Sequence, residues 1–357
     1  MLPRREFARR PNPILHRVTA ETKQPSRAHQ IVAGSRNIAL FFIALFSVGA
    51  IQSRSITVPE SSSLGRKWQH ISERGAQYSL LYVGSSRVVH HFISEQFDAT
   101  LREQGHDAKS FNFGQDGMFP PESLYVLRKL LETTPVRPRW VLIDLMEFTP
   151  VLAKNEYSER AIAWHDLHYT SRTLQTIWSE SGSFSARLGE SVYHGGLLAQ
   201  RTIGVGRGQE PLQLRLKLVQ PRKPPVILNA GYEPLDARPL MGTEKDKFHA
   251  GLAGLQKSSK QVELSAPFRA ELEQIIALVR AHKAVPVFIV APVANSEQRF
   301  KDWPPADVAQ FSYDYPETYP TLYLPDQRYD AEHLDSAGAK EFTRIFATEF
   351  ADWLKRK

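Results

Sequence analysis

The sequence predicts an α/β fold in three layers, with helices on both faces of a mostly parallel sheet. The first indication is a set of short apolar runs of buried-strand length, rich in β-branched and aromatic residues. They lie at Leu80–Gly84, Phe111–Phe113, Trp140–Leu145 and Val285–Pro292. The second indication is that segments with apolar residues at helical spacing separate these runs. Strands that alternate with helices along the chain are typical of a parallel sheet.

Each predicted helix has an apolar face. In the helix expected after the first strand, Val89, Ile93 and Phe97 share one side. Pro120–Glu122 starts the next helix, because proline suits the first helical turn, and four leucines then follow on one face. A further helix precedes the fourth strand, and a last amphipathic helix runs to Leu354.

The charge of the chain is concentrated at its N-terminus. The whole sequence carries a formal charge of +7 and contains no cysteine. Residues 1–36 contain eight Lys or Arg and two Glu, so this basic tail accounts for +6 of that charge. The rest of the chain is close to neutral, which argues against a nucleic-acid-binding surface on the folded part. The absence of cysteine excludes a disulfide, a thiolate nucleophile and a cysteine metal site.

Residues 37–53 form an uncharged run directly after the basic tail. The run is short for a bilayer span, which usually needs about 17–25 residues, and long for the apolar part of a signal peptide. We interpret it as an uncleaved transmembrane signal anchor, with the tail 1–36 in the cytoplasm by the positive-inside rule. Small residues at Val48–Ala50 would also suit cleavage. A buried core helix is a further alternative, but such a helix normally shows a polar face.

The predicted domain organisation follows from these patterns. A linker at 54–76 joins the anchor to an α/β domain at 77–357. Within that domain the alternation of strands and helices breaks down between about 150 and 262, which predicts an irregular insertion. In the insertion, Leu212–Leu218 alternates leucines with polar residues and predicts a strand or a hairpin arm.

Other patterns in the insertion resemble ligand sites only weakly. A basic cluster favours either a solvated face or a surface for anionic glycans or lipid headgroups. Its members are Arg201, Arg207, Arg215, Lys217, Arg222 and Lys223. His165, Asp166 and His168 have a poor spacing for a metal site, so we interpret these histidines as core or surface residues. Gly204–Gly208 lacks the Lys-Ser/Thr of a phosphate-binding loop.

Three predicted turns carry polar groups towards the carboxyl edge of the sheet, where open α/β folds bind their ligands. Gly84–Ser86 follows the first strand, although most such triplets are simple turns. Asp330 precedes His333 by three residues, so its carboxylate can reach the imidazole and fix its tautomer. Asn112–Gly117 follows the second strand and offers glycine N–H groups. A serine nucleophile needs both a base and such donors for the tetrahedral intermediate.

These three segments resemble the sequence blocks of the SGNH (GDSL-like) hydrolase superfamily. Gly84–Ser86 is similar to the first block, with Ser86 at the nucleophile position and Ser85 where Asp is usual. Asn112–Gly117 looks like the second block, and Asp330–Leu334 is closely similar to the last. The resemblance extends over about 78–149 and 265–354.

The resemblance implies a role for each residue that occupies a family position. Ser86 would be the nucleophile, His333 the general base, and Asp330 the partner of that base. The other site residues contribute to the oxyanion hole or bind substrate. They are the N–H groups of Ser86, Gly114 and Gly117, and the side chains of Arg87 and Asn112. The resemblance implies no cofactor and no metal.

One block departs from the family pattern. The third block of the family supplies an Asn side chain to the oxyanion hole, whereas this chain reads Asp144–Glu147 and Met146 cannot donate a hydrogen bond. Loss of one such donor typically costs about a hundred- to a thousand-fold in rate. Either another residue such as Arg87 substitutes for the Asn, or the enzyme is slow or specialised for transfer.

The resemblance is closest to membrane-anchored SGNH-like proteins of bacterial envelopes. It implies a serine-dependent O-acyl esterase or acyltransferase, with acetyl as the expected acyl group, acting on an envelope or exported polysaccharide. The domain would lie outside the cytoplasm, anchored in the bacterial inner membrane, with a membrane acyl-transferring protein as a partner. The alternative is a non-catalytic glycan-binding or assembly component, which the altered third block favours.

Overall fold

The computed structural model describes residues 35–45, 47, 63–146, 159–179, 182–203, 229–257, 263–294 and 300–357. Its contacts divide the chain into two units, Met1–Ser47 and Val48–Lys357. In the first unit, residues 35–45 are helical, and the large apolar side chains from Ile38 to Ile43 are exposed. None of the described helices has the length and apolar character needed to cross a bilayer. Most of the predicted anchor from residue 46 onward lies outside the described residues.

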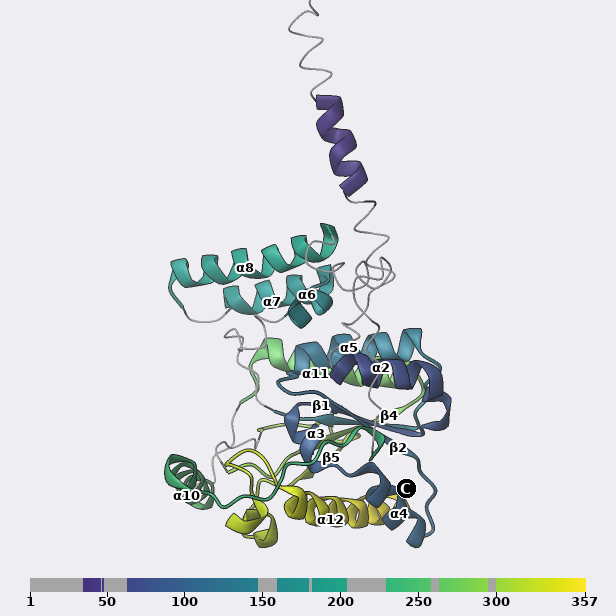
Figure 1. Cartoon of the computed structure of the whole chain (residues 1–357), viewed down its shortest axis with the longest axis vertical. Coiled ribbons are helices and arrows are strands. Elements are labelled where there is room, and N and C mark those ends of the chain that lie inside the picture. The colour runs from purple at the N-terminus through teal and green to yellow at the C-terminus, as the bar shows by residue number, and fades with distance from the viewer. Residues whose placement is uncertain are drawn as a thin grey trace, which may run out of the picture. The chain divides into compact units, whose positions relative to one another are not determined.

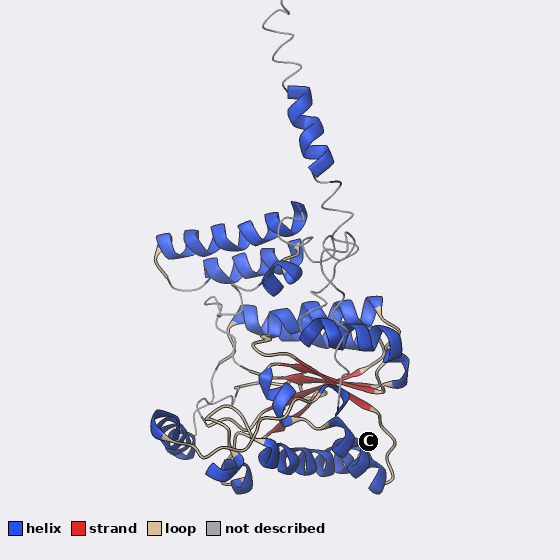
Figure 2. Cartoon of the chain, in the orientation of Figure 1, coloured by secondary structure: helices blue, strands red, loops and turns tan. Residues whose placement is uncertain are grey.

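The second unit is built on a five-stranded parallel sheet with the order β2-β1-β3-β4-β5. The strands lie between layers of helices (Figure 2). The strands are β1 Leu80–Gly84, β2 Ser110–Gly114, β3 Trp140–Asp144, β4 Val285–Val290 and β5 Ala309–Ser312. The α/β class, the parallel sheet and the first four strands are confirmed. Sequence reasoning missed β5, because its four residues are only half-buried and carry no apolar run.

Helices cover both faces of the sheet (Figure 1). Helices α2, α5 and α11 lie on one face, and α4 and α12 on the other, while α3 directly follows β1. Their bounds are α2 Ser63–Arg74, α3 Ser86–His91, α4 Ser94–Glu103, α5 Pro120–Thr133, α11 Ala266–Ala281 and α12 Ser336–Lys355. The pleat of β1 separates two cores: Leu81 and Val83 pack in one, Leu80 and Tyr82 in the other.

The single helix predicted after β1 is two helices, so that prediction was wrong. Ile93 is the N-cap of α4 and does not lie inside a helix. The side-chain amide of Asn112 explains the break, because it donates to the carbonyl oxygens of Val88 (2.6 Å) and Phe92 (2.8 Å). These carbonyls lie at the end of α3, where a continuing helix would have to satisfy them.

The predicted linker at 54–76 extends too far, because α2 belongs to the folded unit. Leu64, Trp68 and Ile71 are buried at 1%, 9% and 0% exposure and pack in the core that β1 and α5 share. Their spacing of four and three residues places them on one helix face. The sequence predicts a short helical patch near Lys67–Arg74 within this linker, and α2 contains that patch and begins four residues earlier.

The insertion predicted to be irregular contains several helical elements in its described part, together with a non-helical stretch at 232–241. Its elements are α6 Glu159–Trp164, α7 Leu167–Ser179, α8 Phe184–Ile203, the 3-10 turn η3 Asn229–Gly231, and α10 Gly242–Lys257. The helical pattern was hard to detect because α6 and α8 bury polar side chains between them. His165 Nε2 lies 2.8 Å from His194 Nδ1, and both imidazoles are buried.

The weak ligand patterns of the insertion have structural explanations where they are described. Asp166 accepts the Tyr169 N–H in the first turn of α7, and His168 is exposed beside Gln274. Arg201 is half-buried and donates to the carbonyl of Ala163. The rest of the basic cluster, Leu212–Leu218 and Gly204–Gly208 lie outside the described residues.

We predict that the buried histidine pair makes the unit sensitive to acid. Burial lowers the pKa of His165 to about 3 and that of His194 to about 4, from an ordinary 6.5. Since the unfolded chain binds these protons more readily, the contribution of the pair is complete above pH 6.5 and is lost as the pH falls towards 4. The free energy of unfolding should decrease by on the order of a few kcal/mol over that range.

Urea unfolding at pH 7, 5.5 and 4.5 measures this effect. In His194→Asn the amide can still hydrogen-bond to His165 without titrating, so the decrease should be smaller than in the unaltered protein. An equal decrease in both proteins would contradict the assignment.

Candidate active site

The candidate site lies where the strand order of the sheet reverses. From β1 the chain continues to β2 on one side, and from β3 to β4 on the other, so the carboxyl ends of β1 and β3 border a switch point. Open α/β sheets bind ligands in the crevice at such a point. Ser85 follows β1, and Asp144 is the last residue of β3.

The turn after β1 depends on a close approach of β3. A Cβ on Gly84 would lie 2.2 Å from the Cβ of Asp144, so only glycine fits there. Asp144 Oδ2 accepts hydrogen bonds from the N–H (3.2 Å) and the hydroxyl (2.5 Å) of Ser85. Ser85 is also the N-cap of α3, so Ser86 is the first residue of that helix. The two serines therefore have different partners.

The structure brings Ser86, His333 and Asp330 together. Ser86 Oγ lies 2.7 Å from His333 Nε2, and His333 Nδ1 lies 3.0 Å from each carboxylate oxygen of Asp330. A carboxylate only accepts hydrogen bonds, so His333 donates through Nδ1–H and offers Nε2 to the hydroxyl. In this tautomer the imidazole can take a proton from Ser86.

Asp330 is held in its ionised form by its surroundings. Burial opposes ionisation, but the hydrogen bonds from the His333 ring and from the N–H groups of Glu332 and His333 outweigh it, so the pKa of Asp330 is lowered. The Glu332 and His333 N–H groups donate to Oδ1 at 2.7 and 2.8 Å. The same contacts fold the short loop around the carboxylate.

A second histidine, His91, anchors that loop to α3. Its Nε2 accepts the Leu334 N–H at 3.0 Å, and Leu334 also pairs with Arg328 in an antiparallel bridge. Burial, followed by the charges near His333 and Arg328, lowers the pKa of His91 well below its ordinary value. The neutral ring is the form that can accept this hydrogen bond. His91 therefore ties the residue after His333 to α3, the helix that begins with Ser86.

The expected oxyanion role of Gly114 is wrong, because its N–H donates to Asn112 Oδ1 at 3.0 Å. Gly117 lies in the next turn, where the Met118 N–H donates to the Gln115 carbonyl. Gly117 has a φ of 63°, a left-handed conformation that favours glycine at the third position of such a turn. The Gln115 N–H donates to the Gly84 carbonyl at 2.9 Å, which places this turn beside the serines.

The expected substrate-binding role of Asn112 is also wrong. Its side chain is fully buried, and its amide group bonds to the end of α3 and to Gly114. Arg87 is 6% exposed, and its guanidinium lies 3.8 Å from Glu332. A direct contact between Arg87 and a substrate stays a prediction. Glu332, which Arg87 contacts, lines the wall of a pocket.

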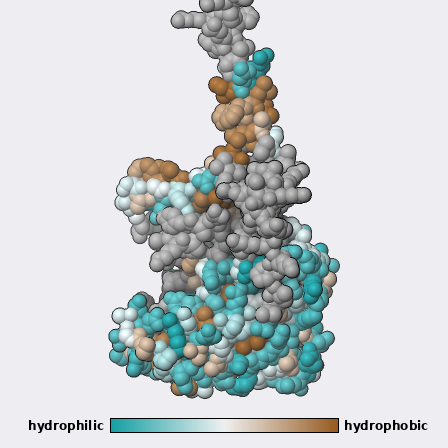
Figure 3. All heavy atoms as spheres, in the orientation of Figure 1, coloured by the Kyte–Doolittle hydropathy of each residue, from teal (hydrophilic) through white to brown (hydrophobic). Residues whose placement is uncertain are grey.

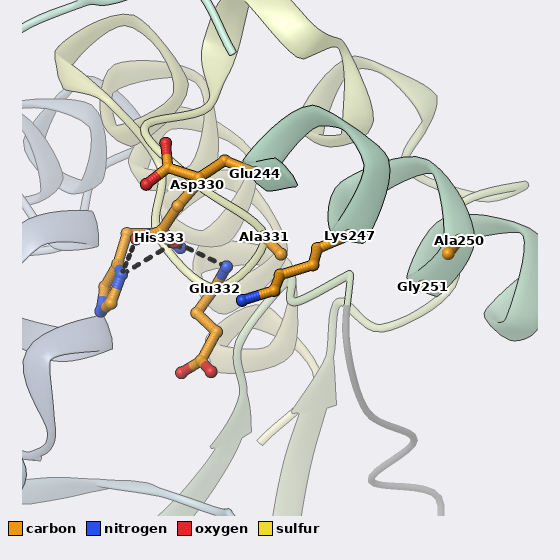
Figure 4. Close-up of a pocket in the computed structure, with 8 residues that line it drawn as sticks. All are labelled: Glu244, Lys247, Ala250, Gly251, Asp330, Ala331, Glu332 and His333. Atoms are coloured by element: carbon orange, nitrogen blue, oxygen red, sulfur yellow. Dashed lines mark hydrogen bonds and ion pairs between the residues drawn. The ribbon is translucent and has the colours of Figure 1, made fainter. Parts of the chain in front are cut away.

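That pocket has a volume of about 640 Å³ and opens beside the imidazole of His333 (Figure 4). One wall is the Asp330–His333 segment. The other wall is α10, which contributes Glu244, Lys247, Ala250 and Gly251. Two small residues on this face of α10 leave space next to the loop, and Lys247 and Glu244 add charged groups. The insertion thus borders the site without contributing to the Ser86–His333–Asp330 contacts.

Sequence reasoning missed a group of residues behind the site. His90 Nδ1 lies 2.6 Å from the Glu233 carbonyl, and His90 Nε2 lies 3.3 Å from Asp116. The rings of His90 and His333 have centroids 5.8 Å apart. Ser86 and His90 are four residues apart on α3 and so share a helix face, which is the one signal that could have indicated His90.

Lys67 is a buried cation in the same region. It is 2% exposed, and its ammonium group donates to the Gly114 carbonyl at 2.8 Å and lies 3.9 Å from Glu233. Burial lowers its pKa to about 8, although Glu233 and Asp116 favour the charged form. Lys67 therefore ties α2 to the end of β2, beside the turn that contains Gly117.

No protein-family model matches this chain, and no curated protein matches it.

We predict that Asp144 is needed to hold the turn after β1. In Asp144→Ala, the buried N–H and hydroxyl of Ser85 lose their acceptor, which should lower the free energy of unfolding by about 1–3 kcal/mol. Ser85→Ala is the matched control, because it keeps the N–H bond and should cost about 0.5–1.5 kcal/mol. Denaturant unfolding of the three proteins measures this. An Asp144→Ala protein as stable as the unaltered one would contradict the prediction.

Proposed function

We propose that the protein is a serine-dependent O-acyl esterase or acyltransferase with an SGNH-like fold. The observation that carries the proposal is the continuous contact from Ser86 Oγ through the His333 ring to Asp330. These three groups come from two turns that are far apart in the sequence, since Ser86 and His333 are separated by 247 positions. A nucleophile, a base and an orienting carboxylate in this order match the chemistry of acyl transfer.

In the proposed mechanism, Ser86 Oγ attacks the carbonyl carbon of an O-acyl group while His333 Nε2 takes the hydroxyl proton. The tetrahedral intermediate then collapses, the ester C–O bond breaks, and His333 returns the proton to the departing hydroxyl. An acyl-Ser86 ester remains. Water or a sugar hydroxyl attacks it in the second half, with His333 again taking and returning a proton. Asp330 holds the Nδ1–H tautomer throughout.

Because the third block lacks the Asn side chain, we propose that backbone N–H groups stabilise the oxyanion. Asp144 is engaged with Ser85 at the site where the family places its Asn block, and the N–H groups of Ser86 and Gly117 are the donors we propose. A weaker oxyanion hole predicts slow turnover, which suits transfer to a bound acceptor more than rapid hydrolysis.

The pocket beside His333 supports the acceptor side of this proposal. A volume of about 640 Å³ is in the range of small-ligand sites, so one or two sugar residues would fit there. The walls carry charged groups such as Lys247 and Glu244, which suit a polar ligand. We propose an envelope or exported polysaccharide as the acceptor, with acetyl as the acyl group and a membrane acyl-transferring protein as its donor.

A non-catalytic glycan-binding or assembly role is the second candidate. The observation that favours it is the missing Asn donor, with Met146 at the corresponding strand end. This candidate and the enzyme differ in whether Ser86 is ever acylated.

We predict that acyl release from a small aryl acetate requires the three contacting groups. Ser86→Ala and His333→Ala should abolish release, and Asp330→Asn should slow it severely, as the same change does by about ten-thousand-fold in serine proteases. Ser85→Ala should have a milder effect than Ser86→Ala, because Ser85 bonds to Asp144 and not to His333. Full activity in His333→Ala would overturn the assignment. If the unaltered protein releases nothing, even with its membrane fraction present, the assembly role becomes the better proposal.

We also propose that residues 1–36 lie in the cytoplasm, that 37–53 anchor the chain in the bacterial inner membrane, and that the α/β unit lies outside. A reporter enzyme that is active only outside the cytoplasm, fused after Lys357, should then be active. A matched reporter that is active only inside the cytoplasm should be inactive at the same position. The reverse result would contradict this topology.

A further inference from the structure

The two ring nitrogens of His90 face groups that can only accept hydrogen bonds. Nδ1 lies 2.6 Å from the Glu233 carbonyl oxygen, and Nε2 lies 3.3 Å from a carboxylate oxygen of Asp116. A neutral imidazole has one N–H and can satisfy only one of these partners. Both contacts are satisfied when His90 is an imidazolium and Asp116 a carboxylate.

This pair joins three separate parts of the fold. His90 is on α3, one helical turn after Ser86. Asp116 is in the Gln115–Met118 turn, next to Gly117. Glu233 follows η3 in the insertion, and its N–H donates to the Val89 carbonyl at 3.1 Å. His90 therefore connects the helix that begins with Ser86 to the turn that contains Gly117.

We propose that the His90–Asp116 ion pair is a clamp that holds the Gln115–Met118 turn against α3 and so positions the Gly117 N–H relative to Ser86. His90 is then a positioning residue, because it acts through the turn and not on the substrate. The effect on acyl transfer rests on the proposed function, while the effect on the turn does not.

The charges around His90 agree with this clamp. Burial opposes the charge, but the hydrogen bonds to Asp116 and to the Glu233 carbonyl outweigh it, so the pKa of His90 is raised. The pKa of Asp116 is lowered, first by its hydrogen bond to His90. The other titratable groups that face the pair are the Glu233 carboxylate, the rings of His91 and His333, and Lys67 beside Asp116.

Because the pKa of His90 is raised, the His90–Asp116 ion pair depends on pH. The imidazolium form is present below the ordinary pKa of histidine and persists somewhat above it. As the pH rises through the raised value, His90 loses a proton and Nε2 then faces the Asp116 carboxylate without a donor. The clamp is therefore expected to open on the alkaline side.

Two variants of one residue separate the charge from the contact. In Asp116→Asn, the new amide can donate to Nε2 of a neutral His90, so the contact survives without titration. In Asp116→Ala the contact is lost. Asp107→Asn is a matched control, since Asp107 is an exposed carboxylate on the loop before β2.

The experiment uses the full chain and three readouts. Nitrogen NMR of labelled histidine should show that His90 keeps two ring N–H groups to a higher pH than a free histidine does, with the signal assigned by His90→Gln. Amide exchange of Met118, whose N–H bonds to the Gln115 carbonyl, should be at least tenfold faster in Asp116→Ala and unchanged in Asp107→Asn. The rate of Ser86 acylation should fall at least tenfold in Asp116→Ala, and Asp116→Asn should lose the alkaline decline of the unaltered protein.

Two results would overturn the clamp: loss of the second ring proton of His90 at or below the pH at which a free histidine loses it, or Met118 exchange in Asp116→Ala at the rate of the unaltered protein. If those two readouts agree with the proposal but the unaltered protein is never acylated, the clamp stands and the proposed enzymatic function fails. If acylation occurs and is equally fast in Asp116→Ala, the turn does not position the oxyanion donor.

Discussion

Because Gly84 has no side chain, Asp144 can approach closely enough to bond to Ser85, and the site depends on this contact. Asp144 lies across this glycine and takes both hydrogen-bond donors of Ser85, which starts α3 in a defined direction from the end of β1. Any larger residue at 84 would displace the carboxylate and leave buried polar groups without partners. Ser86 reaches the imidazole of His333 because its neighbour is tied down in this way.

The short helix α3 then organises three further parts of the molecule. Ser86 contacts His333, His90 contacts the turn at Asp116, and His91 accepts the N–H of Leu334. The two adjacent histidines favour opposite states for a physical reason. Burial and the nearby positive groups favour the neutral form of His91, whereas the two acceptors that face His90 favour its charged form. Protonation of His91 would break its bond to the Leu334 N–H, and deprotonation of His90 would weaken its contact with Asp116.

The sequence was sufficient for the α/β class, for the first four strands and for the proximity of Ser86, His333 and Asp330, because apolar runs and local spacing encode them. It was insufficient where contacts are made across the fold. Asn112 and Gly114 look like site residues in the motif, yet they bond to each other and to the end of α3. Lys67 lies in a stretch that reads as a linker, and only the folded chain brings it to β2. The helices of the insertion were not predicted, because buried His165 and His194 stand where aliphatic side chains would give a clear apolar pattern.

The central claim is that Ser86 is a nucleophile activated by His333, and covalent labelling tests it most directly. The full-length protein would be incubated with an activated serine-ester probe, and its intact mass and the modified peptide would then be determined. A single adduct on Ser86, absent in His333→Ala, is the predicted result. An adduct on Ser85, or no adduct on a folded protein with its membrane fraction present, would contradict it.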